Sequence, residues 1–289
     1  MKKIAFLLFS LMLASCAYED YELNEYKYTT VYCGIPNPVR TLIENEDEDI
    51  KVGVAIGGMR ANLEDQWATF AVDPTLLEKH PQFELLPEKY YTLSDPSNIT
   101  IGKGSLAAGV TLTFNMEEFM KDPLAHTNHY AFPFRIVESS LDSILVNKSS
   151  SITVVKYINQ LDGVYAHKGV DKIFGGDGEL KETIVYSKPD IQKNKIWRLK
   201  TTGARSLVTD GIGSLSGNDG NINISYDDNG AVTLESEAAS LTYVQDACKY
   251  DKDKKILTLN YTFTSKGDRH EVSDTLIFRA HEMKFDVWD

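Results

Sequence analysis

The chain has 289 residues, and its 30 Lys and Arg against 42 Asp and Glu give a formal net charge of −12 at pH 7. Such an acidic chain is repelled by nucleic acid and by anionic lipid, so neither is expected as a partner. Its hydrophobic content of 42% is enough for buried cores, and its length is typical of two ordinary domains.

The first residues have the pattern of a secretory signal. Two lysines precede an apolar run over residues 4–13, which is shorter than the roughly 20 residues that a membrane span needs. The run ends in the sequence LASC, which resembles the lipobox of bacterial lipoproteins, where signal peptidase cuts before the cysteine and lipid is attached to it. We therefore expect residues 1–15 to be a signal peptide and Cys16 to be lipidated. An ordinary signal peptide followed by a chance cysteine is the alternative.

Residues 16–30 are expected to form a lipidated, acidic tether. Glu19, Asp20 and Glu22 follow the cysteine closely, in a polar stretch that is rich in tyrosine. This cluster resembles the export signal of Bacteroidetes surface lipoproteins. The resemblance implies a protein held to the outer membrane by its lipid anchor alone and exposed at the cell surface. A solvated linker that happens to be acidic is the alternative.

Residues 31–158 are expected to form an immunoglobulin-like β-sandwich. Short segments alternate apolar and polar residues, as half-buried strands do, and prolines and glycines separate them. About seven short strands in such a length are typical of this fold. The expected strands include residues 51–58, 67–73, 109–114, 130–138 and 151–158, and one short helix is expected over 115–122.

Residues 159–289 are expected to form a second all-β domain, an antiparallel meander that closes into a lipocalin-like barrel. Barrel closure limits exposed strand edges, and a packed sandwich is the alternative. Asn229-Gly230 is the strongest hairpin signal, because both residues accept the positive φ of a type I′ turn. The expected strands lie within residues 179–187, 195–203, 221–236, 239–250, 255–265 and 270–280.

Two cysteines remain after Cys16. Cys33 and Cys248 could form a disulfide outside the cytoplasm, but they lie far apart in the sequence. We expect two unpaired thiols.

Several stretches resemble known modules of Bacteroidetes lipoproteins. The stretches FAVDPTLLEKHPQFELLPEKYYTLSDPSNITIGKGS and HYAFPFRIVESS resemble the N-terminal module called domain of unknown function 1735. The stretches LDGVYAHKG, LTLNYTF and DTLIFRA resemble the C-terminal domain of unknown function 4361. The resemblance implies a surface glycan-binding protein or spacer of a polysaccharide-utilisation system, working beside an outer-membrane importer pair.

The sequence shows no pattern of a catalytic or metal-binding site. His126 and His129 have no carboxylate or cysteine at metal-ligand spacing. The acidic run at 46–49 is interpreted as a solvated loop, with a calcium site as the alternative. No Gly-X-Ser-X-Gly elbow is present for a serine nucleophile. We expect no enzyme, no cofactor and no metal, although a pair of facing carboxylates leaves a weak glycosidase open as an alternative.

Glycan binding needs an aromatic ring that stacks on a sugar face, with polar side chains beside it. The candidates are Trp67, which opens an expected strand, Trp197 in KIWRLK, and Trp288 next to the chain end. For each, a core or edge position is the competing interpretation. We predict non-catalytic glycan binding, with the second domain carrying a ligand whose identity the sequence does not specify. A structural or adhesive protein that contacts other proteins is the alternative, and an exposed aromatic platform or an unpaired strand edge would discriminate the two.

Overall fold

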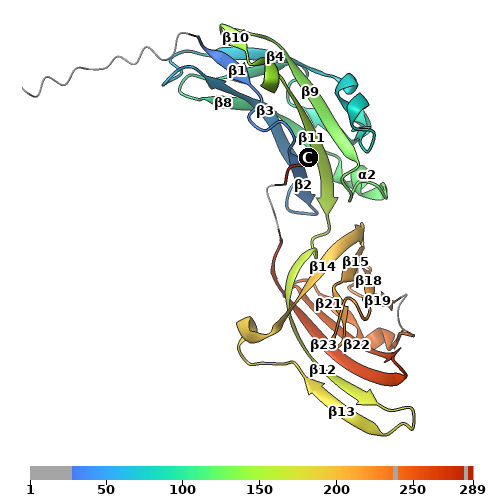
Figure 1. Ribbon diagram of the computed structural model, residues 1–289. Helices are drawn as coiled ribbons and strands as arrows, with labels where there is room; N and C mark the ends of the chain where they lie inside the picture. Colours follow the sequence, from blue (N-terminus) through green and yellow to red (C-terminus); the bar gives the residue numbers. More distant parts are fainter. Residues whose placement is uncertain (1–27, 237–239, 283–285, 289) are drawn as a thin grey trace, which may run out of the picture.

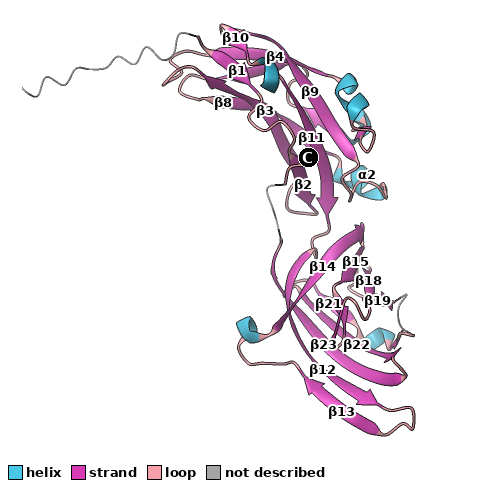
Figure 2. Ribbon diagram, viewed as in Figure 1, coloured by secondary structure: helices cyan, strands magenta, loops and turns pink. Residues whose placement is uncertain are grey.

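The computed structural model describes residues 28–236, 240–282 and 286–288 (Figure 1). The expected signal peptide, Cys16 and most of the expected tether lie outside these residues. The described chain consists of strands with a few short helices (Figure 2), which confirms the expected all-β class. The helices are η2 (Pro74–Lys79), η3 (Glu88–Tyr90), α2 (Met116–Lys121), η4 (Val146–Lys148), η5 (Ile191–Lys193) and η6 (Gln245–Ala247).

The first part of the chain folds into an immunoglobulin-like sandwich of two sheets. One sheet contains, in spatial order, β10 (Ser143–Ile144), β1 (Thr30–Tyr32), β3 (Asp49–Gly57), β8 (Ala107–Phe114) and β6 (Tyr91–Leu93). The other contains, in spatial order, β2 (Val39–Ile43), β11 (Ser150–Ile158), β9 (Tyr130–Ser139), β4 (Gln66–Val72) and β7 (Asn98–Ile101), with β5 (Glu84–Leu85) beside β9.

Alternation along the strands builds the sandwich core. In β3, Val52, Val54 and Ile56 are buried while the residues between them are at least partly accessible, as the period of two predicts. The expected helix is confirmed as α2, where the Asn115 side chain accepts a hydrogen bond from the Glu118 N–H and Phe119 is buried in the core.

The chain crosses from one sheet to the other between β1 and β2. β1 pairs antiparallel with β3, and β2 pairs parallel with β11 in the opposite sheet. Between them, the carbonyls of Pro36 and Pro38 accept hydrogen bonds from Ile152 and Val154 of β11. A proline has no backbone N–H to donate to a second strand. The hydrogen bonds of Pro36 and Pro38 therefore connect the crossing segment to β11.

The second part of the chain is an antiparallel meander that closes on itself. Its barrel strands are β12 (Gly163–Phe174), β14 (Lys195–Gly203), β15 (Ser206–Thr209), β18 (Asn223–Tyr226), β19 (Val232–Glu235), β21 (Lys249–Asp251), β22 (Ile256–Ser265) and β23 (Asp268–Ala280). Consecutive strands of this set pair with each other, except that β19 does not form a ladder with β21. The last strand, β23, pairs with the first, β12. A bridge between Ala231 and Lys249 closes the gap beside β19. Shorter strands are β13 (Leu180–Val185), β16 (Gly211–Ile212), β17 (Leu215–Ser216) and β20 (Thr242–Tyr243).

Two details of the expected meander are corrected. The β18–β19 hairpin forms around Asn229-Gly230, but its loop runs from 227 to 231 and only Gly230 has a positive φ, so the turn is not type I′. The Asp227 carboxylate instead accepts the N–H groups of Asn229 and Ala231. The segment expected as one strand over 239–250 is split, because η6 separates β20 from β21.

The end of the chain returns to the first sandwich. Val287 bridges to Pro38, and the Val39 N–H donates to the Asp286 carbonyl at 2.8 Å. The last described residues therefore lie against the sandwich that begins the chain, although the sequence assigned all of 159–289 to the second domain.

Candidate functional sites

Trp67 is the tryptophan candidate with the most accessible ring. It lies on β4 with 41% of its surface exposed, while its neighbours Gln66 and Ala68 are buried. Its main chain is held by Ser140, whose hydroxyl accepts the Trp67 N–H at 2.9 Å. The strand alternation thus directs the indole out of the sandwich from a firmly held backbone.

Polar side chains surround this ring. Trp67 pairs with Thr100 and Thr69 pairs with Asn98 across the β4–β7 ladder, so the four side chains share the outer face of the sheet. The Asn98 amide donates to the Thr100 hydroxyl at 3.3 Å. We call these four residues the Trp67 face. It combines a flat aromatic ring with hydroxyl and amide groups at the open edge of the sheet.

Trp197 lies inside the barrel and is only 5% exposed. Its indole stacks on the imidazole of His167 with ring centroids 3.7 Å apart. The sequence pattern correctly separated Trp197 and Leu199 from Ile196 on opposite faces of the strand, and barrel closure placed the tryptophan face inward. A ring buried in this way cannot stack on a sugar, which corrects the expectation for Trp197.

Trp288 is half-buried against the first sandwich. Its ring meets those of His80 and Phe83 edge-on, with centroids 4.7 and 4.9 Å away, and its indole N–H donates to the Ile152 carbonyl at 2.8 Å. The indole is therefore engaged in packing and in a hydrogen bond. We interpret Trp288 as an anchor for the chain end rather than as a glycan platform.

A buried polar network fills one part of the barrel. The Asp274 carboxylate accepts hydrogen bonds from the hydroxyls of Tyr186 at 2.5 Å and Tyr261 at 2.8 Å, and contacts the His167 Nε2 at 2.9 Å. Burial, followed by the nearby Asp274 charge, raises the pKa of both tyrosines well above the usual value. A Cβ at Gly169 would fall 2.3 Å from the Asp274 carboxylate, so glycine is needed beside it.

A second buried cluster lies nearby. Asp171 contacts the His270 Nδ1 at 3.0 Å and accepts a hydrogen bond from the Ser214 hydroxyl at 2.6 Å, and the His270 ring stacks on Phe263. The serine is bonded to the aspartate rather than to the histidine, so the three groups do not form a nucleophile–base pair.

The sequence interpretation missed these two clusters, although the signal was present. Alternate residues of β12 and β23 face into the barrel. These inward positions include 167 and 171 of β12 and 270 and 274 of β23, so two histidine and two aspartate side chains lie inside together.

The two cysteines in the described part of the chain lie in buried positions. Cys33 and Cys248 are free and buried, as expected, and burial raises the pKa of the Cys33 thiol to about 12. Residues 28–236, 240–282 and 286–288 contain no group of three or more His, Cys, Asp or Glu side chains arranged to hold a metal ion. Over the same residues, no helix is both long and apolar enough to cross a membrane.

The barrel wall carries a shallow groove of about 540 Å³ on its outer side. Lys172, Asn260, Glu271 and Ser273 line it from three adjacent strands, and the Ser273 hydroxyl donates to the Asn260 amide oxygen at 2.8 Å. Tyr243 pairs with the inward-facing Tyr261, which places its ring toward the core. The groove therefore offers hydrogen bonds, whereas the Trp67 face adds an accessible ring.

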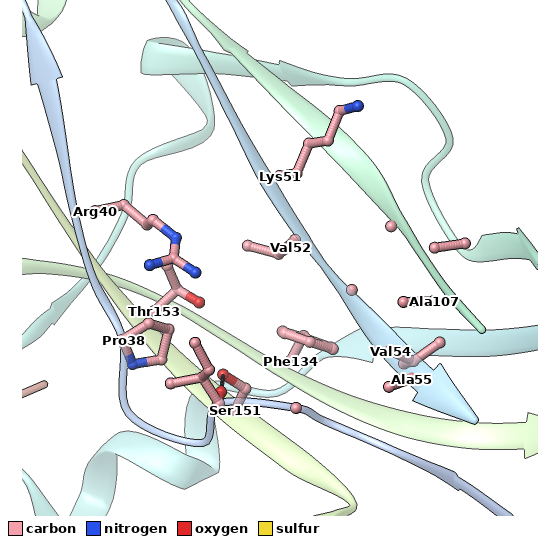
Figure 3. A pocket seen from close by; sticks show the side chains of 15 residues that line it. Pro38, Arg40, Lys51, Val52, Val54, Ala55, Ala107, Phe134, Ser151 and Thr153 are labelled. Carbon is pink, nitrogen blue, oxygen red and sulfur yellow. Dashed lines mark hydrogen bonds between the residues drawn. The ribbon is translucent and has the colours of Figure 1, made fainter. Parts of the chain in front are cut away.

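A second groove of about 540 Å³ opens between β3 and β2 of the sandwich (Figure 3). Arg40 extends from β2 and Lys51 stands on β3, and Phe134 lies between the two strands. Beside this groove, β1 pairs with β3 only at residues 55–57.

Comparison with known proteins supports the fold. A family model described only as an N-terminal domain matches residues 22–143. No curated protein matches the chain. A crystal structure of a protein of unknown function from Bacteroides ovatus is similar, with 22% identity and a TM-score of 0.67, covering 89% of this chain and 96% of that one.

A multidomain protein from the same organism, which includes DUF1735, is similar over 87% of this chain and 94% of its own, with 12% identity and a TM-score of 0.43. The first relative shares the two-part fold over almost the whole of both chains.

Proposed function

We propose that this protein is a non-catalytic glycan-binding lipoprotein of the cell surface, and that the Trp67 face is its binding surface. The exposed Trp67 ring carries the proposal. A sugar ring presents a C–H face that an indole can cover, and the neighbouring hydroxyl and amide groups can bond its hydroxyls. The proposal moves the ligand from the second domain, where Trp197 is buried, to the first.

The setting of this proposal comes from the beginning of the chain. Lipid on Cys16 would hold the protein to the outer membrane, and the acidic residues that follow would direct it to the outer face. A glycan bound there would be passed to an outer-membrane importer pair. Radiolabelled palmitate should enter the wild-type protein and be absent from Cys16→Ala, and protease added to intact cells should degrade the wild-type protein.

The binding proposal is tested with a glycan array followed by calorimetry, using the chain from residue 17 onward. We expect Trp67→Ala to weaken binding of any hit at least tenfold, a loss of about 1.4 kcal/mol. Asn98→Ala should weaken it less. The matched control is Tyr28→Ala, because Tyr28 is another exposed aromatic residue at 73% exposure.

Two results would contradict the proposal. One is a set of hits whose affinity Trp67→Ala leaves unchanged. The other is the absence of a hit across plant and host glycans, which would favour a structural or adhesive role.

A further inference from the structure

Among the residues that the structure describes, strand β3 has a partner on only one side along part of its length. β8 pairs with residues 49–55 of β3, whereas β1 pairs with 55–57 alone. After Tyr32 the chain leaves this sheet, and the Cys33 N–H donates to the Lys148 carbonyl at 2.8 Å. Within the described residues, the stretch from Lys51 to Val54 therefore has an open edge on the side opposite β8.

The hydrogen-bond pattern shows which main-chain groups face this opening. The Ile56 N–H donates to the Leu106 carbonyl, and the Glu48 carbonyl accepts from Phe114, so the even-numbered residues of β3 bond toward β8. Because antiparallel strands alternate the side to which successive residues bond, Lys51 and Gly53 direct their N–H and C=O groups toward the open side.

A groove lies beside the unpaired stretch of β3. Its volume is about 540 Å³. Ile35, at 44% exposure, supplies accessible apolar surface beside the edge, while Phe134 and Pro38 form a buried floor (Figure 3). Gly53 and Gly109 face each other across the β3–β8 ladder, and a Cβ on Gly53 would fall 2.1 Å from the Ala108 carbonyl oxygen. Glycine is therefore required there, and no side chain of Gly53 obstructs the edge.

The charges at the opening are of one sign. Arg40 and Lys51 both line the groove, and among the residues that the structure describes neither has a carboxylate within ion-pair distance. Both cations stand at the same opening, and no carboxylate lines it among the described residues. A carboxylate entering the groove would meet both.

We propose that the open edge of β3 accepts an extended acidic segment of a partner protein, which adds to the sheet as a strand. Main-chain hydrogen bonds to Lys51 and Gly53 would hold the segment, apolar side chains would pack against the exposed Ile35, and carboxylates would face Arg40 and Lys51. This protein-binding edge is independent of the glycan surface proposed above, which lies on the other sheet of the sandwich.

The test uses fluorescence anisotropy with labelled eight-residue peptides and the chain from residue 17 onward. A peptide that alternates Val and Glu is expected to bind, and one that alternates Val and Lys is not. Arg40→Glu with Lys51→Glu should weaken binding of the acidic peptide at least tenfold, whereas Lys172→Glu on the barrel should leave it unchanged. Thermal unfolding of each variant shows that the fold is retained.

The peptide backbone provides a second arm that needs no protein variant. Two acidic peptides, N-methylated on one or the other alternate set of residues, keep the same side chains. One of the two should lose binding, because its methyl groups replace the N–H donors that face β3. Equal binding of both would show that charge alone attracts the peptide, and would overturn strand addition.

Other outcomes also overturn the proposal. If the acidic peptide does not bind and Lys51→Ala makes the protein self-associate, Lys51 only guards the edge against other copies. If the peptide binds only when the chain begins at residue 28, the protein's own residues 17–27 occupy the edge and the assignment to a partner fails.

Discussion

The imidazole of His167 stacks on the indole of Trp197 with ring centroids 3.7 Å apart, and both side chains are buried. This pair joins the apolar core of the barrel to its polar network, because the same imidazole contacts Asp274. The contact explains why a tryptophan that looks like a ligand platform in the sequence belongs to the core.

Replacing Trp197 by Ala should destabilise the protein by about 3–5 kcal/mol, because a large aromatic side chain is removed from a filled core. Trp67→Ala is the matched control, and it should change stability by no more than about 0.5 kcal/mol, since that ring is exposed. Urea unfolding followed by circular dichroism measures both. Equal losses for the two variants would contradict the placement of these rings.

Asp274→Ala should destabilise the protein by about 3–5 kcal/mol. The substitution leaves the buried hydroxyls of Tyr186 and Tyr261 without their acceptor. Ser273→Ala, one residue away on the outer face, is the control and should cost less than about 1 kcal/mol. Chemical denaturation at neutral pH provides the comparison, and a neutral effect of Asp274→Ala would show that the network adds little.

Trp288→Ala should lower stability by about 1–3 kcal/mol, because the ring contacts with His80 and Phe83 and the hydrogen bond to Ile152 are lost together. Trp288→Phe keeps an aromatic ring without the N–H and should lose less. Val287→Ala is the control, since Val287 is 56% exposed. Thermal unfolding with limited proteolysis of the first sandwich would detect the change, and resistance equal to wild type would argue against an anchoring role.

Glu44→Gln should stabilise the protein at pH 7 but not at pH 3. Burial raises the pKa of Glu44, and the Gln160 N–H and Arg205 oppose that shift only in part. A carboxyl group with a raised pKa in the folded state adds stability below its ordinary pKa and loses that contribution as pH rises through the folded value.

At pH 7 the ionised Glu44 is therefore unfavourable, and an amide that still accepts the Gln160 N–H removes the cost. We expect Tm to rise by roughly 2 °C at pH 7, a shift that about 0.5–1 kcal/mol produces in a protein of this size. Glu78→Gln, at an exposed position, is the control. A gain that persists unchanged at pH 3 would contradict the assignment to ionisation.

Local patterns in the sequence were enough to predict the all-β class, the short helix α2 and most of the longer strands, although β12 lies outside the expected strand ranges. Alternation is a property of neighbouring residues, so it marks β22 and the separation of Trp197 from Ile196 without any knowledge of the fold. The errors concern features that alternation does not encode. The turn type at Asn229-Gly230 depends on the φ values of those residues, and η6 interrupts the expected strand over 239–250.

Which face of a strand is buried was settled only when distant strands met. Trp197 faces inward because β14 closes a barrel with β12, and Trp67 faces outward because β4 packs its other face in the sandwich. Trp288 meets Ile152 across 136 positions in the chain, and the open edge of β3 exists because β1 leaves for the other sheet. Such relationships arise from contacts between residues far apart in the chain, which no periodicity of neighbouring residues encodes.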